Sequence, residues 1–281
     1  MSTSRGIAAA AAVTLALAFA ACAPSLSTFQ PAHVAPPGHV QVSMGLEAAV
    51  SVGALADAID QGKSLAGRAA AGQTLTDDEK WRLFDAGINL ALNAPSVGPH
   101  FGLAYTLLPR FEVNLRYAGT ALRVGTRYQL LARATGAPVD VVLGVGVAHY
   151  SFEFPIPQIE IIKIEDFSRW QLDVPLLVGA SRDWYRVWAG PKLVFTWFDT
   201  RMALALPSER PVAMLDGTAH YIGGQAGLAL GYRSLFLAFE LTMASASGRA
   251  SVTSIGLNPP TRSTTLSTFL VYPSFGLMGE F

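Results

Sequence analysis

Apolar and polar side chains alternate along most of the chain after residue 39, with the period of two that is typical of β-strands. The clearest case is a hairpin over 111–131, in which Val113 and Leu115 share one face of the first arm while Glu112 and Arg116 share the other. The same alternation recurs, with varying clarity, at 40–50, 100–107, 139–150, 169–178, 185–197, 219–230, 235–243 and 265–281. These ranges predict an all-β chain of about ten strands.

The two faces of the predicted strands differ in chemistry. One is uniformly apolar, and the charged members of the other are Glu112, Arg116, Arg123, Arg127, Asp140, Asp173, Arg186, Lys192 and Glu240. Alternation alone is equally compatible with a soluble β-fold. Aromatic side chains near the strand ends, such as Tyr117, Trp170 and Trp197 at one end and Tyr128 at the other, favour a membrane barrel, because girdles of this kind mark lipid–water interfaces. We therefore predict a closed antiparallel transmembrane β-barrel with these charges lining its lumen.

The last predicted strand supports this interpretation. It places one set of apolar side chains on a single face: Phe269, Val271, Phe275, Leu277 and Phe281. This arrangement resembles the C-terminal signature of bacterial outer-membrane β-barrel proteins, although Gly279 stands where an aromatic or aliphatic residue is usual. The resemblance is to the class as a whole. It implies location in the bacterial outer membrane, contact with outer-membrane lipid, and delivery to the barrel-assembly machinery through the strand that ends at Phe281.

The connections between strands fall into two groups. If the N-terminus lies in the periplasm, the periplasmic turns are short and the outer loops span about 51–98, 151–167, 198–217 and 247–263. Within 51–98, Thr76 and Glu79 form a capping box ahead of a helix that ends before Pro95, and a second, shorter helix is expected at 54–59. We expect a helical insertion in the first outer loop, either as a cap or plug for the barrel or as a surface pair of helices.

The N-terminal residues predict export. Residues 1–21 contain an apolar run over 6–19 that is too short for a comfortable membrane span, and small residues follow it. Cys22, the one cysteine of the chain, then resembles the acylated first residue of a bacterial lipoprotein. Cleavage of an ordinary signal peptide near Ala21 is the alternative. A single cysteine also excludes an intrachain disulfide and a zinc site built on cysteines.

Composition narrows the function further. Residues 22–38 are rich in proline and small residues and predict an extended tether with little to bury, which leaves 39–281 for the barrel. The chain has 20 basic and 20 acidic residues and a formal net charge of +0, which argues against nucleic acid as a partner. No metal-ligand spacing or cofactor motif is present. Opposite charges in a narrow lumen are expected to pair, so a wide, open pore is not predicted.

Two sets of residues are candidates for chemistry. His149 and Ser151, with Glu160 or Glu165 as the orienting carboxylate, resemble the His-x-Ser site of outer-membrane lipid A deacylases, although Phe152 replaces the asparagine of that motif. The second set would suit a protease of the omptin kind and consists of Asp77, Asp78, Asp216 and His220. It lacks that family's closely spaced Asp-x-His pair.

Three functions therefore remain open from sequence. The leading one is a non-enzymatic outer-membrane barrel that is either structural or a narrow solute channel with exposed loops. The second is a hydrolase at the barrel rim that uses His149, Ser151 and Glu160. The third is a surface adhesion or binding protein.

Overall fold

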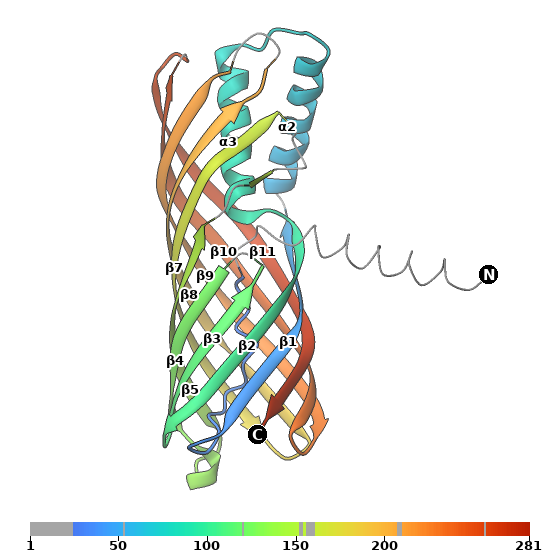
Figure 1. Ribbon diagram of the computed structural model, residues 1–281, viewed down its shortest axis with the longest axis vertical. Helices are drawn as coiled ribbons and strands as arrows, with labels where there is room; N and C mark the ends of the chain where they lie inside the picture. Colours follow the sequence, from blue (N-terminus) through green and yellow to red (C-terminus); the bar gives the residue numbers. More distant parts are fainter. Residues whose placement is uncertain are drawn as a thin grey trace, which may run out of the picture.

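The computed structural model describes residues 25–52, 54–119, 121–151, 154–155, 161–206, 210–255 and 257–281. Its strands are β1 Val40–Val52, β2 Ser96–Leu108, β3 Phe111–Ala118, β4 Ala121–Leu131, β5 Asp140–Ser151, β6 Phe154–Pro155, β7 Ile162–Ser181, β8 Tyr185–Leu204, β9 Val212–Tyr232, β10 Leu235–Ile255 and β11 Thr261–Glu280. They pair antiparallel in the order β5-β4-β3-β2-β1-β11-β10-β9-β8-β7, and β5 pairs with β7 to close the ring (Figure 1). The predicted barrel of about ten strands is confirmed, and the two-residue β6 only extends the edge of β7.

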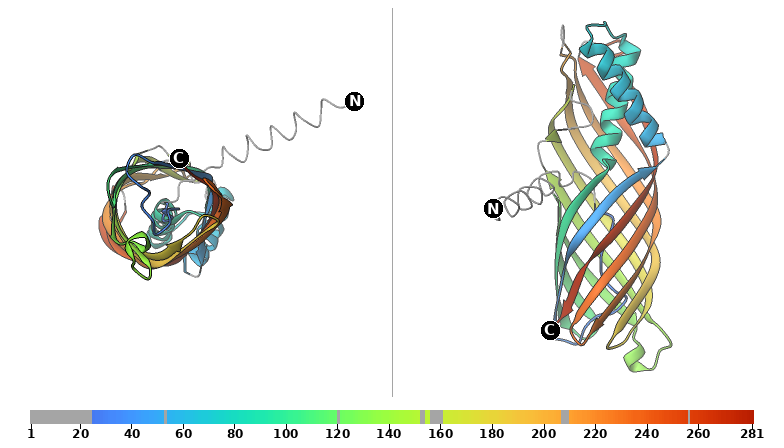
Figure 2. Two further views of the ribbon diagram at one scale, coloured as in Figure 1. Left: turned by 90° about the horizontal axis from the view of Figure 1, so that it is seen from below. Right: turned by 90° about the vertical axis from the view of Figure 1, so that its right-hand side faces the viewer.

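The wall of this barrel has two heights. Strands β3, β4 and β5 have 8, 11 and 12 residues, whereas each strand from β7 to β11 has 20 or 21. Short turns join the strands at the end where the chain terminates, and the tall strands project from the opposite end (Figures 1 and 2). Because short turns face the periplasm in barrels of this class, the tall wall projects outward.

The tall wall corrects the prediction of long outer loops. The segments expected as loops at 198–217 and 247–263 are largely strand, and their connections shrink to 205–211 and 256–260. In the segment expected as a loop at 151–167, residues 162–167 belong to β7. Apolar and polar residues still alternate in these segments, but the apolar residues now point inward and the polar residues outward. Beyond Trp197, Asp199 and Arg201 point outward while Phe198 and Met202 are buried inside. Strands predicted from an apolar outer face are therefore shorter than the observed strands.

The helical insertion covers the inner side of this extension. It consists of α2 Ala54–Ala70, which is longer than the predicted 54–59, and α3 Asp77–Asn93. The predicted capping box is confirmed: the Glu79 N–H donates to Thr76 Oγ1 at 3.3 Å, and the Thr76 N–H donates to Glu79 Oε2 at 2.9 Å. The Thr76 N–H and Arg68 hold the pKa of Glu79 below its ordinary value.

One face of α3 forms a core with the tall wall. Trp81, Phe84 and Ile88 are fully buried and belong to a cluster with inward-facing Phe198 and Met202. The inner face of the wall is apolar here because a helix rather than a lumen lies against it. No helix in the described ranges is both long and apolar enough to cross a membrane.

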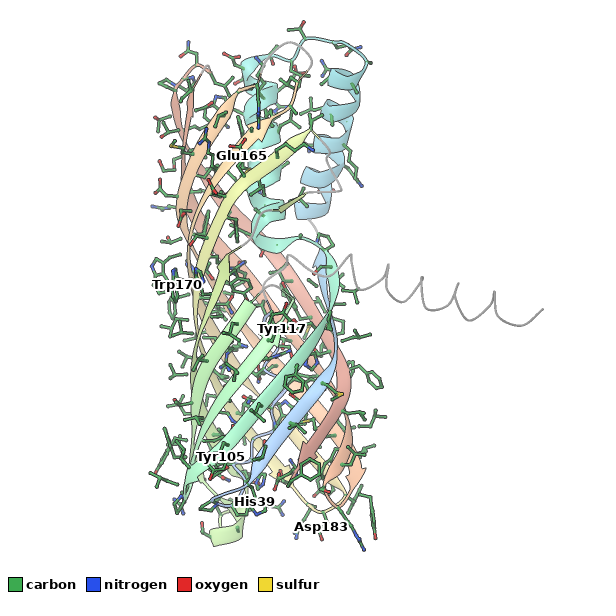
Figure 3. The ribbon with its side chains drawn as sticks, in the orientation of Figure 1. His39, Tyr105, Tyr117, Glu165, Trp170 and Asp183 are labelled. Atoms are coloured by element: carbon green, nitrogen blue, oxygen red, sulfur yellow. The ribbon has the colours of Figure 1, made fainter. Side chains whose placement is uncertain are left out.

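Lower down, the outer face of the barrel is an apolar belt. On β10 the outward residues are apolar over the nine positions from Leu235 to Met243 and polar from Ser245 to Thr253. Those nine positions match the length a tilted strand needs to cross a bilayer core. Trp170 and Trp197 pair across β7 and β8 at the upper edge of the belt, and both are about half exposed (Figure 3). A belt of this kind is unsuited to water, so the chain is a transmembrane β-barrel of the architecture found in bacterial outer membranes.

Candidate functional site

Residues 25–38, called the plug segment below, run through the lumen as an extended chain (Figures 1 and 2). Leu26, Phe29 and Ala32 are at most 1% exposed. The sequence predicted a tether with little to bury, and the structure differs because small and prolyl residues make a chain thin enough for a narrow barrel. Gly179 of the wall also leaves space for the segment, because a Cβ at this position would lie only 2.9 Å from the Cβ of Ala32.

Cations of the wall satisfy the carbonyls of the plug segment. An extended chain without a neighbouring strand leaves its carbonyl groups without partners, which is costly in a buried place. Arg127 donates to the carbonyls of Pro31 at 2.7 Å and of His33 at 3.2 Å. Two further contacts of this kind run from Arg116 to the Ser27 carbonyl and from Lys192 to the Leu26 carbonyl.

Glu240 on β10 satisfies the donors of the same segment. Its Oε1 accepts from the Ser27 hydroxyl at 2.6 Å and from the Thr28 and Phe29 N–H groups at 3.0 Å each. Its Oε2 accepts from Trp188 Nε1 at 2.9 Å, and the Glu240 side chain is fully buried. One carboxyl group thus anchors three consecutive residues of the plug segment to the wall.

The wall charges also pair with one another. All nine predicted lumen charges point inward and are at most 8% exposed. The pairs are Arg127–Glu112 at 2.6 Å, Arg123–Asp173 at 2.6 Å, Arg116–Glu47 at 2.7 Å, Lys192–Asp173 at 3.9 Å and Arg186–Glu280 at 2.7 Å. Asp140 instead accepts from Gln129 Nε2 at 3.0 Å and from the Arg133 N–H at 2.8 Å. Because these side chains fill the space around the plug segment, the lumen is a packed polar core.

Sequence reasoning missed three lumen charges: Glu47, Arg169 and Glu280. Arg169 closes the outer end of the lumen, where its Nη1 donates to the Leu92 carbonyl at 3.0 Å and its Nη2 to Tyr221 Oη at 3.2 Å. Leu92 lies in the last turn of α3, where the helix dipole favours a cation. The sequence does contain a signal for Arg169, because Arg169 lies on the same polar face of its strand as Asp173. The alternation of this strand was counted from the adjacent Trp170 on the apolar face, so Arg169 was left out.

The periplasmic end of the lumen is less tightly filled. A recess of about 410 Å³ opens there beside the end of the plug segment. Its lining includes His33, Pro36, Arg110, Gln129 and Asp140.

The proposed rim hydrolase site is only partly described. His149 faces outward and its ring lies 4.4 Å from that of Trp170, in the girdle. The side chain of Ser151 and the whole of Glu160 lie outside the described residues. Glu165 pairs with Arg201 at 3.0 Å and lies five strand positions beyond Trp170, about 16 Å along the wall (Figure 3). Within the described residues, no carboxylate pairs with His149.

The residues considered for a protease do not converge. Asp216 and His220 point outward from β9, whereas Asp77 and Asp78 begin α3, which packs on the inner face of the same wall. His220 instead pairs across the strands with the Ser247 hydroxyl, at 2.7 Å on the exposed face. Among the residues that the structure describes, no three metal-ligating side chains are placed to hold a metal ion.

Comparison with solved structures finds similarity at low TM-scores and very low sequence identity. No family model and no curated protein matches the chain. The outer membrane protease OmpT from Escherichia coli is similar with a TM-score of 0.43 and 8% identity, over 86% of this chain and 96% of that one. Ail, the attachment invasion locus protein of Yersinia pestis, has a TM-score of 0.31 and 8% identity over 88% and 100% of the chains. CarO from Acinetobacter baumannii has a TM-score of 0.31 and 12% identity, over 58% of this chain and 93% of that one.

Proposed function

We propose that this protein is a non-enzymatic, structural outer-membrane barrel whose lumen is closed by its own plug segment. The observation that carries the proposal is the filling of the lumen by residues 25–38, several of whose donors and acceptors are bonded to wall charges. A solute would have to displace this segment and leave buried ions without partners, which is strongly unfavourable.

With a closed lumen, the part of this barrel that other molecules can contact is the part that projects outside the cell. The tall strands and the α2–α3 pair form a packed body above the apolar belt, and most outward residues of its wall are polar. Rigid strands and a buried helix face hold this body in a fixed orientation relative to the membrane. We propose that presenting this body outside the cell is the role of the membrane-spanning part.

The processing of the chain belongs to the same proposal. Residues 1–21 act as a signal peptide, and Cys22 becomes the acylated first residue of the mature chain. The strand that ends at Phe281 carries the signal for the assembly machinery. A Cβ at Gly279 would lie 2.8 Å from the Phe281 ring, so glycine at this departure from the usual pattern lets the terminal ring lie over the strand. Mass spectrometry of the purified protein tests the processing, with a diacylated or triacylated Cys22 as the expected N-terminus.

Planar-bilayer recording tests the closed lumen. The refolded full-length mature protein should be silent at all voltages, while an open porin inserted in the same membrane conducts. Steady channel openings from the folded wild-type protein would refute closure. Folding is checked separately by heat-modifiable migration on a gel, so silence cannot come from unfolded material.

Lipid analysis tests the non-enzymatic part. Cells that carry the wild-type protein, Ser151→Ala or Ser247→Ala should have the same lipid A and phospholipid acylation as cells without the protein. A loss of acyl chains that depends on Ser151 would replace this proposal with a rim hydrolase. A loss that depends on Ser247 would place the hydrolase at the exposed pair with His220.

A further inference from the structure

The direction of the plug segment is fixed at both of its ends. At its start the Ser25 N–H donates to Tyr150 Oη at 3.2 Å, and Tyr150 is the next-to-last residue of β5, at the outer end. At its finish the Gly38 N–H donates to the Thr106 carbonyl at 2.9 Å, near the periplasmic turn after β2. The plug segment therefore runs from the outer end of the lumen to the periplasmic end, opposite to β1.

Ser25 lies at the level of the outer lipid interface. Its partner Tyr150 adjoins His149, whose ring packs in a tilted arrangement against that of Trp170 in the upper aromatic girdle. A second contact holds Ser25 in place, since its hydroxyl donates to Glu47 Oε2 at 2.9 Å. Ser25 is also partly exposed, in contrast to the buried residues that follow it.

The wall beside Ser25 is low. Tyr150 pairs with Ala121, at the top of the short β3–β4 hairpin, and β3 has only 8 residues. Below Ser25 the lumen is filled by Leu26, Phe29 and the wall charges. The lumen below Ser25 is therefore filled, whereas the low rim beside Ser25 leaves the outer side open.

We infer that the mature N-terminus lies on the outer side of the membrane, and that the chain passes backward through its own barrel before β1 begins. Cleavage before Cys22 leaves three residues ahead of Ser25, which span at most about 11 Å. The first mature residue is then confined to the neighbourhood of the low rim. An acyl group attached at this position enters the outer leaflet rather than the periplasmic one. This inference differs from the premise of a periplasmic N-terminus from which the loops were assigned in the sequence.

Cysteine labelling of intact cells tests this topology. Ala23→Cys should react with a membrane-impermeant maleimide on intact cells, to the same level as Thr74→Cys in the exposed turn between α2 and α3. Asp183→Cys, in the exposed turn between β7 and β8 at the periplasmic end, should react only after the outer membrane is permeabilised (Figure 3). Heat-modifiable migration shows that each variant contains a folded barrel.

Two results would overturn the inference. Labelling of Ala23→Cys only after permeabilisation would place the N-terminus in the periplasm. Labelling only after denaturation would place it inside the wall. An epitope inserted between residues 23 and 24 gives an independent readout, because antibody should bind it on intact cells. These outcomes are separate from bilayer conductance, so a conducting barrel with an outer N-terminus would refute the proposed function alone.

Discussion

Replacing Glu240 by leucine should release the plug segment. The substitution removes the acceptor for the Thr28 and Phe29 N–H groups, which are bonded at 3.0 Å in a buried place. Each buried donor left without a partner costs about 1–3 kcal/mol, so two of them sum to about 2–6 kcal/mol. Since every 1.4 kcal/mol is a factor of ten, the open state of the segment should become about 30-fold to 20,000-fold more populated.

Native-state hydrogen exchange measures this change at the residues concerned. In Glu240→Leu the amide protons of Thr28 and Phe29 should exchange faster by the factor just given, while β-strand amides far from the lumen anchor keep their protection. Glu240→Gln is the matched variant, because its side-chain carbonyl still accepts the same bonds, and we expect a much smaller change. Unaltered protection of Thr28 and Phe29 in folded Glu240→Leu would refute the role of Glu240 as an anchor.

Three further predictions concern the helical pair and the lumen. Thr76→Ala should destabilise α3 by about 1 kcal/mol through loss of its N-cap, seen as faster exchange in its first turn. Burial raises the pKa of Asp85, so its contribution to stability is present below its unfolded pKa and is lost as pH rises through the folded one. Asp85→Asn should therefore resist proteolysis of the helical pair better than wild type at neutral pH and equally at low pH. Arg123→Leu should lower barrel stability in urea by about 3–5 kcal/mol, because Asp173 is left buried without its bidentate partner.

Each of these predictions has a control variant or an outcome that would contradict it. Thr74→Ala, two residues before the cap, should leave exchange in α3 unchanged, and an equal effect of both variants would remove the capping argument. A wild-type advantage over Asp85→Asn at neutral pH would contradict the assigned cost of burial. Combining Arg123→Leu with Asp173→Leu should recover much of the lost stability, and a double variant less stable than the single one would show that the pair is favourable in its own right.

The membrane-spanning part could be predicted from sequence because its signals are local. Alternation places Glu112 and Arg127 on one face and their apolar neighbours on the other, whatever the rest of the chain does. The capping box of Thr76 and Glu79 is likewise complete within four residues. Glu47 was missed because small residues such as Gly45 and Ala48 weaken the alternation of β1.

The height of the wall could be predicted only in part. The strands beyond Trp197 still alternate, but their apolar face turns inward, because water replaces lipid outside and α3 replaces the lumen inside. Alternation therefore identifies a strand without saying which solvent faces it. The pairing of α3 with Phe198 and Met202 joins residues more than 100 positions apart, and no local pattern encodes it.

The sequence by itself determined a barrel with a charged interior, an apolar exterior and a capped helix, because period and capping depend on neighbouring residues alone. Only the tertiary structure decided that residues 25–38 fill the lumen. A segment of small and prolyl residues has no face of its own, so its burial depends on the partners that surround it. Those partners, Arg127 and Glu240 among them, come together only when the ring closes. The direction of the segment through the lumen follows from that closure.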